Sequence, residues 1–244
     1  RSGHGSLNVS EAITNSCNVF FYEVGYQLGL NGDKYDQDLG NEKLAKYASM
    51  YGLNEKSGIE IEESEPQISD ALSVVSAIGQ GTNNFTTVGL ARYVTTVANS
   101  GTCYDLTLLD KVTDTSGNLL VNYSANVRNT IDMPQSYWNA IHQGMRGVVQ
   151  NKKYYQDFGV EVAGKTGTAE EDKSRPNHGL FVGYAPYDNP EVSMAIRIAN
   201  GYSSDYACQL SKQLMTVYFD LDENGALTDS QTCLLYTSPS PRDA

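Results

Sequence analysis

The sequence has few of the residues that build metal and redox sites. It contains four cysteines and three histidines in 244 residues. No Cys-x-x-Cys pair occurs, although zinc and thioredoxin-like sites depend on such short spacings. We therefore expect no metal, no cofactor and no disulfide. These scattered residues are Cys17, Cys103, Cys208, Cys233, His4, His142 and His178.

Positive charge and long apolar runs are also scarce. Seventeen Lys and Arg stand against 29 Asp and Glu, which gives a net charge of −12. The electrostatic field of a chain with this net negative charge repels phosphate backbones, so nucleic acid is not an expected partner. No run of about 18 apolar residues occurs, and the first thirty positions lack the order of a signal peptide. The chain is therefore expected to be soluble or to be a piece of an anchored protein, and its start at Arg1 rather than at a Met makes the second alternative the main question.

Apolar residues are frequent enough for a folded core. They make up 40% of the chain, and charged residues make up 19%, which is typical of a globular protein and not of a disordered one. Their spacing predicts helices through most of the first 150 positions. Ser10 is the expected N-cap of the first helix. Further helices are expected at 20–28, 44–51, 88–98 and 134–149.

The last third of the chain has the pattern of strands. Apolar runs at 160–168, 179–184 and 192–198 are joined by short links, which favours an antiparallel sheet because parallel neighbours need a long crossover. A helix at 204–218 is expected to pack across this sheet. The fold class is therefore α+β. A separate hairpin is expected at 108–112 and 119–123, and the acidic stretch 60–65 is expected to be a solvated loop.

The end of the chain differs in character from the rest. No periodicity continues beyond Asp222, and the last twelve residues resemble translated vector or adapter sequence. We interpret residues 1–222 as one domain and residues 223–244 as a tail that is non-native from about residue 232.

The strongest local signal for chemistry is Lys165-Thr166-Gly167-Thr168 on an expected strand. Lys165 supplies a cation, Gly167 lets a substrate backbone approach without a Cβ in the way, and Thr168 offers a hydroxyl and a backbone N–H. Together they are able to hold a carboxylate and stabilise an oxyanion. The alternative interpretation is a surface lysine followed by a turn, because a given three-residue string occurs by chance in roughly one of twenty chains of this length.

A second signal is Ser16-x-Asn18, between a short helix and a strongly apolar one. A hydroxyl and an amide two positions apart on a loop are able to point into one cleft, where the hydroxyl passes a proton and the amide holds a peptide. Taken alone, the two residues are better explained as a capping or turn pair.

The two signals together carry a resemblance. Ser-x-Asn followed about 150 residues later by Lys-Thr-Gly is the order found in penicillin-binding proteins and class A β-lactamases. Over residues 1 to about 220 the chain resembles the transpeptidase domain of the class B high-molecular-weight penicillin-binding proteins. The resemblance implies a β-lactamase/transpeptidase-like fold, with an antiparallel sheet flanked by helices, a helical subdomain and an incomplete N-terminus. Supporting segments lie at 3–5, 16–22, 78–81, 144–149 and 181–186.

The resemblance implies a peptidoglycan D,D-transpeptidase that cross-links stem peptides by serine acyl transfer and binds β-lactams. Ser16 would relay a proton and Asn18 would bind the substrate amide. Lys165 would lend positive charge beside Ser16, and Thr166 and Thr168 would hold the substrate carboxylate. By the same resemblance, the intact protein would have a membrane anchor outside this fragment and an extracytoplasmic catalytic domain, and a membrane glycosyltransferase is a candidate partner.

The sequence departs from the family at the nucleophile. The motif Ser-x-x-Lys should precede Ser16, but no lysine of this chain has a serine three positions before it. The nucleophile and its lysine base are therefore absent, and we expect the fragment to be inactive. Loss of the helix that bears them should expose apolar surface on the helices after Ser16 and at Trp138.

Other functions stay open at this point. A serine β-lactamase and a D,D-carboxypeptidase use the same chemistry with water as the acceptor. A non-catalytic β-lactam sensor domain keeps acylation without turnover. No acidic motif placed for deacylation lies between Asn18 and Lys165, which favours transfer over hydrolysis. A fragment that folds poorly is the remaining alternative.

Overall fold

The computed structural model describes residues 3–222 and 224–227. Its α-helices are α1 (Val9–Thr14), α2 (Asn18–Leu28), α3 (Gln37–Met50), α4 (Ser73–Ser76), α5 (Thr87–Ala98), α6 (Gln135–Gln150) and α7 (Ser204–Tyr218), with a 3-10 turn η1 (Lys153–Tyr155). Its strands are β1 (Leu30–Asn31), β2 (Lys34–Tyr35), β3 (Thr102–Asp105), β4 (Lys111–Thr113), β5 (Leu119–Asn122), β6 (Asn126–Thr130), β7 (Ala163–Ala169), β8 (His178–Ala185) and β9 (Val192–Ile198).

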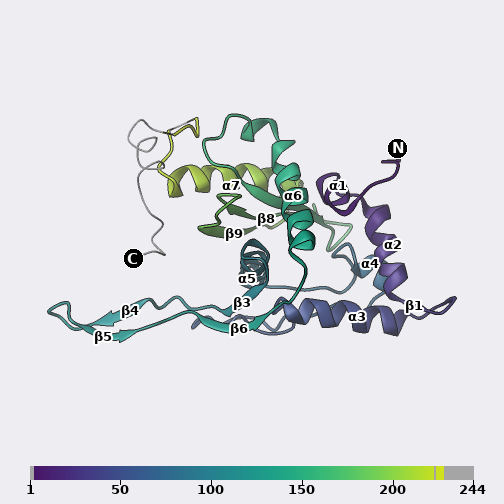
Figure 1. The fold of residues 1–244 in the computed structure, drawn as a ribbon, viewed down its shortest axis with the longest axis horizontal. Coiled ribbons are helices and arrows are strands. Elements are labelled where there is room, and N and C mark those ends of the chain that lie inside the picture. The colour runs from purple at the N-terminus through teal and green to yellow at the C-terminus, as the bar shows by residue number, and fades with distance from the viewer. Residues whose placement is uncertain (1–2, 223, 228–244) are drawn as a thin grey trace.

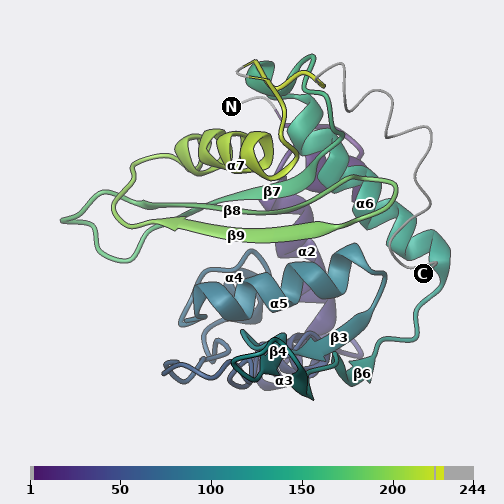
Figure 2. The same cartoon turned by 90° about the vertical axis from the view of Figure 1, so that its left-hand side faces the viewer.

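The centre of the molecule is a three-stranded antiparallel sheet in the order β7-β8-β9. Thr166 lies opposite Phe181, and Phe181 lies opposite Ile196. Helix α7 covers one face of the sheet and α5 the other, while α6 lies along β7 (Figures 1 and 2). The predicted antiparallel sheet and its covering helix are confirmed, although β7 begins at Ala163 rather than at residue 160.

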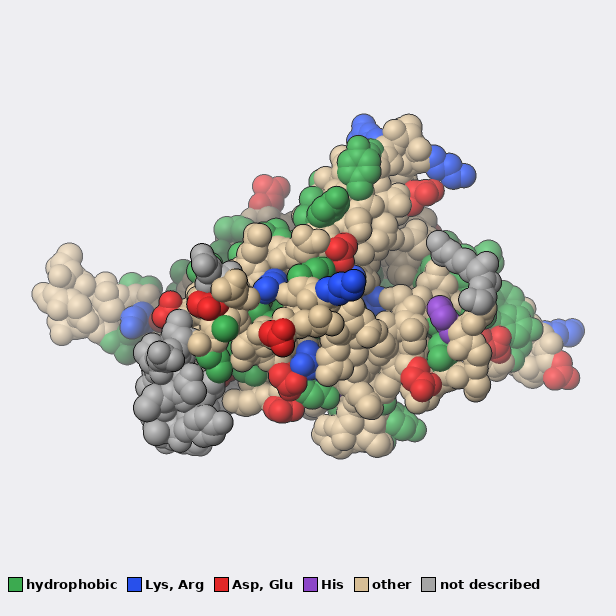
Figure 3. Space-filling model, turned by 90° about the horizontal axis from the view of Figure 1, so that it is seen from above, with side chains coloured by type: hydrophobic (Ala, Val, Ile, Leu, Met, Phe, Trp, Pro, Cys, Tyr) green, Lys and Arg blue, Asp and Glu red, His purple; other side chains and the backbone are tan. Residues whose placement is uncertain are grey.

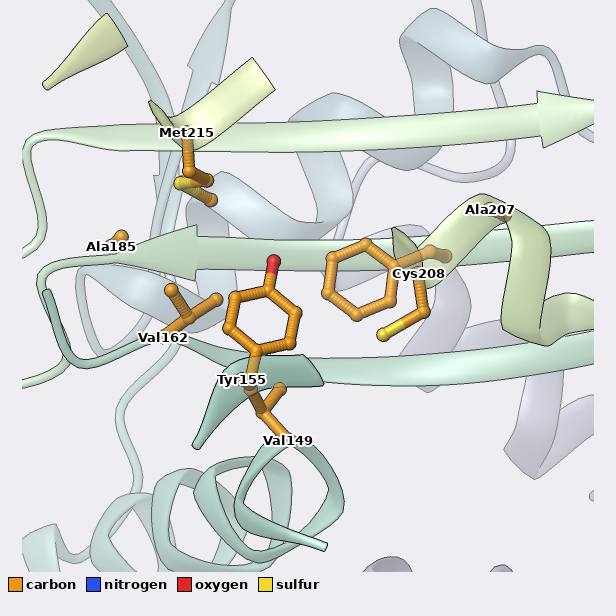
Figure 4. Close-up of a cluster of buried hydrophobic side chains, with 8 residues drawn as sticks. Val149, Tyr155, Val162, Ala185, Ala207, Cys208 and Met215 are labelled. Carbon is orange, nitrogen blue, oxygen red and sulfur yellow. The ribbon is translucent and has the colours of Figure 1, made fainter. Parts of the chain in front are cut away.

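Two apolar clusters hold these layers together. Between the sheet and α7, Tyr155 and Phe181 pack with Cys208 and Met215 (Figure 4). On the other face, α5 and α6 pack against Ala163 and Tyr184. Since both faces of β7 are covered, the strand is held between two packed layers. The buried members of the first cluster are Val149, Tyr155, Val162, Phe181, Ala185, Ala207, Cys208 and Met215.

The other half of the molecule is built from α2, α3 and α4 and three short two-stranded sheets. The predicted hairpin is present as β4–β5, and it projects from the body as an arm (Figure 1). The pairing of β3 with β6 was not predicted, because Asn126–Thr130 is a polar segment with no strand pattern in its sequence.

Several local predictions were wrong. The N-cap of α1 is Asn8, not Ser10: Asn8 and Glu11 form a reciprocal capping box, and Ser10 instead donates to the carbonyl of Ala140. Helix α3 starts at Gln37, seven residues before the predicted start, because the Asp36 carboxylate caps its first N–H groups.

Trp138 is buried rather than exposed. Only 2% of its surface is accessible, because its ring packs against Gly101 and edge-on to Tyr51. The expected exposure of apolar side chains is, however, found on the helix after Ser16. On α2, Val19 is 74% exposed and Val24 is also exposed. Of the two places where exposed apolar surface was expected, α2 has it and Trp138 does not.

The acidic stretch 60–65 lies outside helices and strands as predicted, but it is more than a solvated loop. Glu63 accepts hydrogen bonds from Ser57 and Thr86, so it ties the loop to the start of α5. Cys17, Cys103 and Cys208 are free thiols, and Cys233 lies outside the described residues.

The described chain ends in a turn at residues 224–227, where the Gly159 N–H donates to the carbonyl of Gly225. The division at residue 222 stays a prediction, and most of the expected tail lies outside the described residues. Among the helices of the described part, none is long and apolar enough to cross a membrane.

Candidate active site

Ser16 lies in a strained turn at the end of α1. The Ser16 N–H donates to the carbonyl of Ile13, and the Cys17 N–H donates to that of Ala12, which is the Schellman pattern of a helix C-terminus. This pattern needs a left-handed residue, and Ser16 has φ +48°. A glycine would meet this need without strain, whereas a residue with a Cβ pays about 1–2 kcal/mol. The serine therefore occupies a backbone position that favours glycine.

Lys165 reaches this turn from the sheet. Its Nζ donates to Ser16 Oγ at 2.6 Å and to the carbonyl of Thr166 at 2.8 Å. The two side chains come from positions 149 residues apart. Helix α1 packs on α6, and α6 packs on β7, so one helix aligns the two motifs.

The environment of Lys165 weakens its hold on the proton. Burial, assisted by the charge of Lys152, lowers the pKa of Lys165 from 10.5 to about 8. Desolvation disfavours the charged form of a lysine, and a neighbouring cation adds to that effect. At neutral pH the side chain is therefore still mainly cationic, but it sits close to the range in which a lysine exchanges protons.

Strand β7 presents the rest of the motif at an open edge. It is an outer strand of the described sheet, and Thr168 is exposed while Thr166 and Gly167 are half-buried. No side-chain hydrogen bond within the described residues occupies either threonine hydroxyl. These hydroxyls and the strand edge are thus available to bind a carboxylate or an extended peptide.

The two glycines of β7 differ in what they do. A Cβ at Gly164 would lie 2.3 Å from the Phe181 ring, so packing requires a glycine there. A Cβ at Gly167 would meet only Leu180 at 3.6 Å, an ordinary contact. The fold does not need a glycine at 167, which is consistent with a close approach by a ligand.

Asn18 lies near Ser16, but not on a loop as predicted. It is the first residue of α2, with Cys17 as the N-cap residue. Its side chain is exposed and has no hydrogen-bond partner among the described residues. Cys17 is buried, so Ser16 and Asn18 are the two exposed residues of the triplet.

A hollow of about 330 Å³ lies along α2. It is mainly apolar and runs between α2 and α3. It is separate from the lysine, since neither Ser16 nor Lys165 lines it. Its lining residues are Phe20, Glu23, Val24, Gln27, Leu28 and Lys43.

Residues 1–216 match the family described as the penicillin-binding protein transpeptidase domain. The chain belongs to this family. The match includes both Ser16-x-Asn18 and Lys165-Thr166-Gly167-Thr168, and it confirms the resemblance inferred from them.

Named relatives of this transpeptidase domain include three bacterial proteins. The chain is 27% identical to the peptidoglycan D,D-transpeptidase MrdA of Haemophilus influenzae, over 90% of this chain and 37% of that protein. It is 28% identical to penicillin-binding protein 2A of Bacillus subtilis, over 89% and 35%. It is also 28% identical to stage V sporulation protein D of Bacillus subtilis, over 82% and 31%. The chain thus spans about a third of the length of these relatives.

Solved penicillin-binding proteins share the fold. Pseudomonas aeruginosa PBP2 in complex with WCK 5153 aligns with a TM-score of 0.74 at 24% identity, over 96% of this chain and 52% of that one. Penicillin-binding protein 2B of Streptococcus pneumoniae strain R6 aligns with a TM-score of 0.73 at 23% identity, over 89% and 40%. The α+β transpeptidase fold is therefore confirmed.

Lys152 is a residue of this transpeptidase domain that the sequence did not point to. It follows α6, and its Nζ lies 2.8 Å from the Asp205 carboxylate at the start of α7. It lies in no motif and 13 positions before Lys165, so only the packing of α6 against β7 shows that its charge acts on Lys165.

Proposed function

We propose that the protein containing this chain is a peptidoglycan D,D-transpeptidase, with Ser16, Asn18 and Lys165 as catalytic residues. The observation that carries the proposal is the hydrogen bond from Lys165 Nζ to Ser16 Oγ. It joins the Ser-x-Asn and Lys-Thr-Gly motifs into one site at the edge of β7. The named activity of the MrdA relatives supports the same reaction.

The reaction begins when a serine Oγ attacks the carbonyl carbon between the two terminal D-alanines of a stem peptide. The C–N bond breaks, and the terminal D-alanine leaves with a proton on its nitrogen. Ser16 is placed to relay this proton, because its hydroxyl is bonded to the cation that lowers the energy of its anionic form. An amine of a neighbouring stem peptide then attacks the ester, forms the new amide and releases the serine.

The remaining residues bind the substrate. Thr166 and Thr168 hold the terminal carboxylate beside the Lys165 charge, Gly167 admits the peptide backbone, and the Thr168 N–H forms half of the oxyanion hole. The exposed Asn18 amide binds the penultimate amide of the substrate. A β-lactam occupies the same positions as the D-Ala-D-Ala unit.

The nucleophile of this reaction belongs to a Ser-x-x-Lys motif, and the 244-residue sequence contains no such motif. We place it in a longer chain with a membrane anchor, working at the extracytoplasmic face. A membrane glycosyltransferase is the expected partner. A similar solved chain, 25% identical, comes from a structure titled as a peptidoglycan synthase complex that coordinates polymerization and crosslinking.

The full-length product of the gene tests this proposal. Incubated with lipid-linked peptidoglycan precursors and a polymerase, it should yield cross-linked stem peptides, and it should not turn over nitrocefin. Lys165→Ala should lower the cross-linking rate by about 10²–10³-fold, while Lys173→Ala on the exposed β7–β8 loop should leave it unchanged. Nitrocefin turnover would identify a β-lactamase instead, and stable acylation without cross-linking would identify a sensor domain.

A further inference from the structure

The β4–β5 hairpin is an apolar arm that contacts little of the body. It projects beyond the rest of the molecule (Figure 1), and its far end carries almost no charged side chains in the view from above (Figure 3). Every residue of β4 and β5 is exposed. Leu119 and Leu120 are 59% and 63% exposed, and Val112 and Val121 are exposed as well. Apolar side chains gathered on one projecting element mark a contact surface.

The arm is well formed despite its isolation. The Asp114 carboxylate accepts hydrogen bonds from the N–H groups of Ser116 and Asn118 and from the Asn118 amide. Gly117 takes the left-handed conformation of the turn. An isolated hairpin is marginal in water, so a turn with this many hydrogen bonds preorganises the two strands.

The two edges of the hairpin differ in charge. Neither edge is paired with another strand in the described part of the chain. Strand β4 carries Lys111 and is flanked by Asp110 and Asp114, and charges of this kind protect an edge from pairing. Residues 119–123 contain Leu, Leu, Val, Asn and Tyr, with neither charge nor proline. Strand β5 is thus the unprotected edge.

We propose that β5 pairs antiparallel with β5 of a second copy of this chain, so that two arms form a four-stranded sheet. An antiparallel edge is self-complementary about a two-fold axis, which is the commonest symmetry of dimers. The chain has a net charge of −12, so two copies repel one another over most of their surfaces. An uncharged β5 edge on an arm that stands clear of the body lets them approach at low electrostatic cost.

The surface that the arm offers is small. A standard interface uses about 20–30 residues a side, and the arm supplies far fewer. The dimer is therefore weak, with a Kd on the order of 10–100 µM. This inference is independent of the proposed function, since neither Ser16 nor Lys165 takes part.

Sedimentation velocity of the 244-residue chain at concentrations from about 5 to 500 µM tests the dimer, because this range spans the expected Kd. The average mass should rise toward twice that of the monomer. Leu120→Lys should weaken association at least about tenfold, because it places a charge at the pairing edge. Val217→Lys is the matched control on α7, where the residue is 81% exposed, and it should dimerise like the parent.

Hydrogen exchange at the two ends of that concentration range locates the contact. Backbone amides of residues 119–123 should exchange more slowly at high concentration, and those of α7 should not change. A chain that stays monomeric throughout overturns the proposal. Dimers that survive Leu120→Lys, or that form without slower exchange in β5, overturn it equally. Unchanged circular dichroism of the variant shows that it is folded.

Discussion

At the scale of single residues, the site depends on two side chains held in unfavourable states. Ser16 has a left-handed backbone, and Lys165 is a half-buried cation bonded to it. Strain and desolvation of this kind gather at functional sites. Both motifs were predictable from the sequence, because their spacing and order are distinctive. The left-handed backbone of Ser16 was not, because a glycine would have signalled such a turn and a serine does not.

The lowered pKa of Lys165 leads to a prediction on pH. Its proton should be lost as the pH rises through about 8, the value set by burial and by the charge of Lys152. Lys152→Gln should raise the pKa of Lys165, but not to 10.5, because burial is the larger cause. Titration of the lysine side-chain carbons by NMR measures both values. A midpoint at 10.5 in the parent chain would contradict the site geometry, and Lys173→Gln is the control.

The same shift affects stability. The pKa of Lys165 is lower in the folded chain than in the unfolded one, so the unfolded chain binds more protons between pH 8 and 10.5. The contribution of Lys165 to the free energy of unfolding therefore rises with pH across this window. Below pH 8 the group disfavours folding, which fits a residue retained for function.

At the scale of elements, two glycines of α6 set the position of Ser16. A Cβ at Gly144 would lie 2.8 Å from the Ile13 Cβ, and one at Gly147 would lie 2.4 Å from the Thr14 Oγ1. Thr14 Oγ1 also donates to the carbonyl of Gly144. These contacts give a physical reason for the glycines of the 144–149 segment: they let α1 lie directly on α6.

Gly144→Ala tests this role. The added methyl group should push α1 away from α6 and lower the free energy of unfolding by about 1–3 kcal/mol. Because Ser16 ends α1, the hydrogen bond to Lys165 should weaken as well. Urea denaturation and the NMR signals of Lys165 measure the two effects. Gly3→Ala is the control, since a Cβ there meets nothing within 4 Å. Equal stability of the two variants would count against the role of α6.

The helices and strands differed in how well they could be predicted from the sequence. Strands β7, β8 and β9 were predictable, because apolar runs alternate with short links. Helix α5 was predictable from Thr86 and the broad apolar face that follows it. The β3–β6 pair was not, since β6 is polar and its partner lies beyond an intervening hairpin. The burial of Trp138 was missed because its partners Tyr51 and Gly101 are distant in sequence.

At the scale of the whole molecule, the described chain is a packed unit with an apolar flank on α2. The sheet is covered on both faces, whereas α2 exposes Val19 and Val24 beside the hollow of about 330 Å³. This surface adjoins Ser16 and Asn18. It is consistent with our proposal that a segment bearing Ser-x-x-Lys completes the site from outside the 244 residues.

Covalent labelling with fluorescent penicillin tests the central claim most directly. The 244-residue chain and the full-length product of its gene are incubated with the label side by side. We predict that only the longer product is labelled, on the serine of a Ser-x-x-Lys motif, and that Ser16→Gly, which suits the left-handed turn, slows its labelling. Covalent label on the 244-residue chain, or an unchanged rate in Ser16→Gly, would contradict the account.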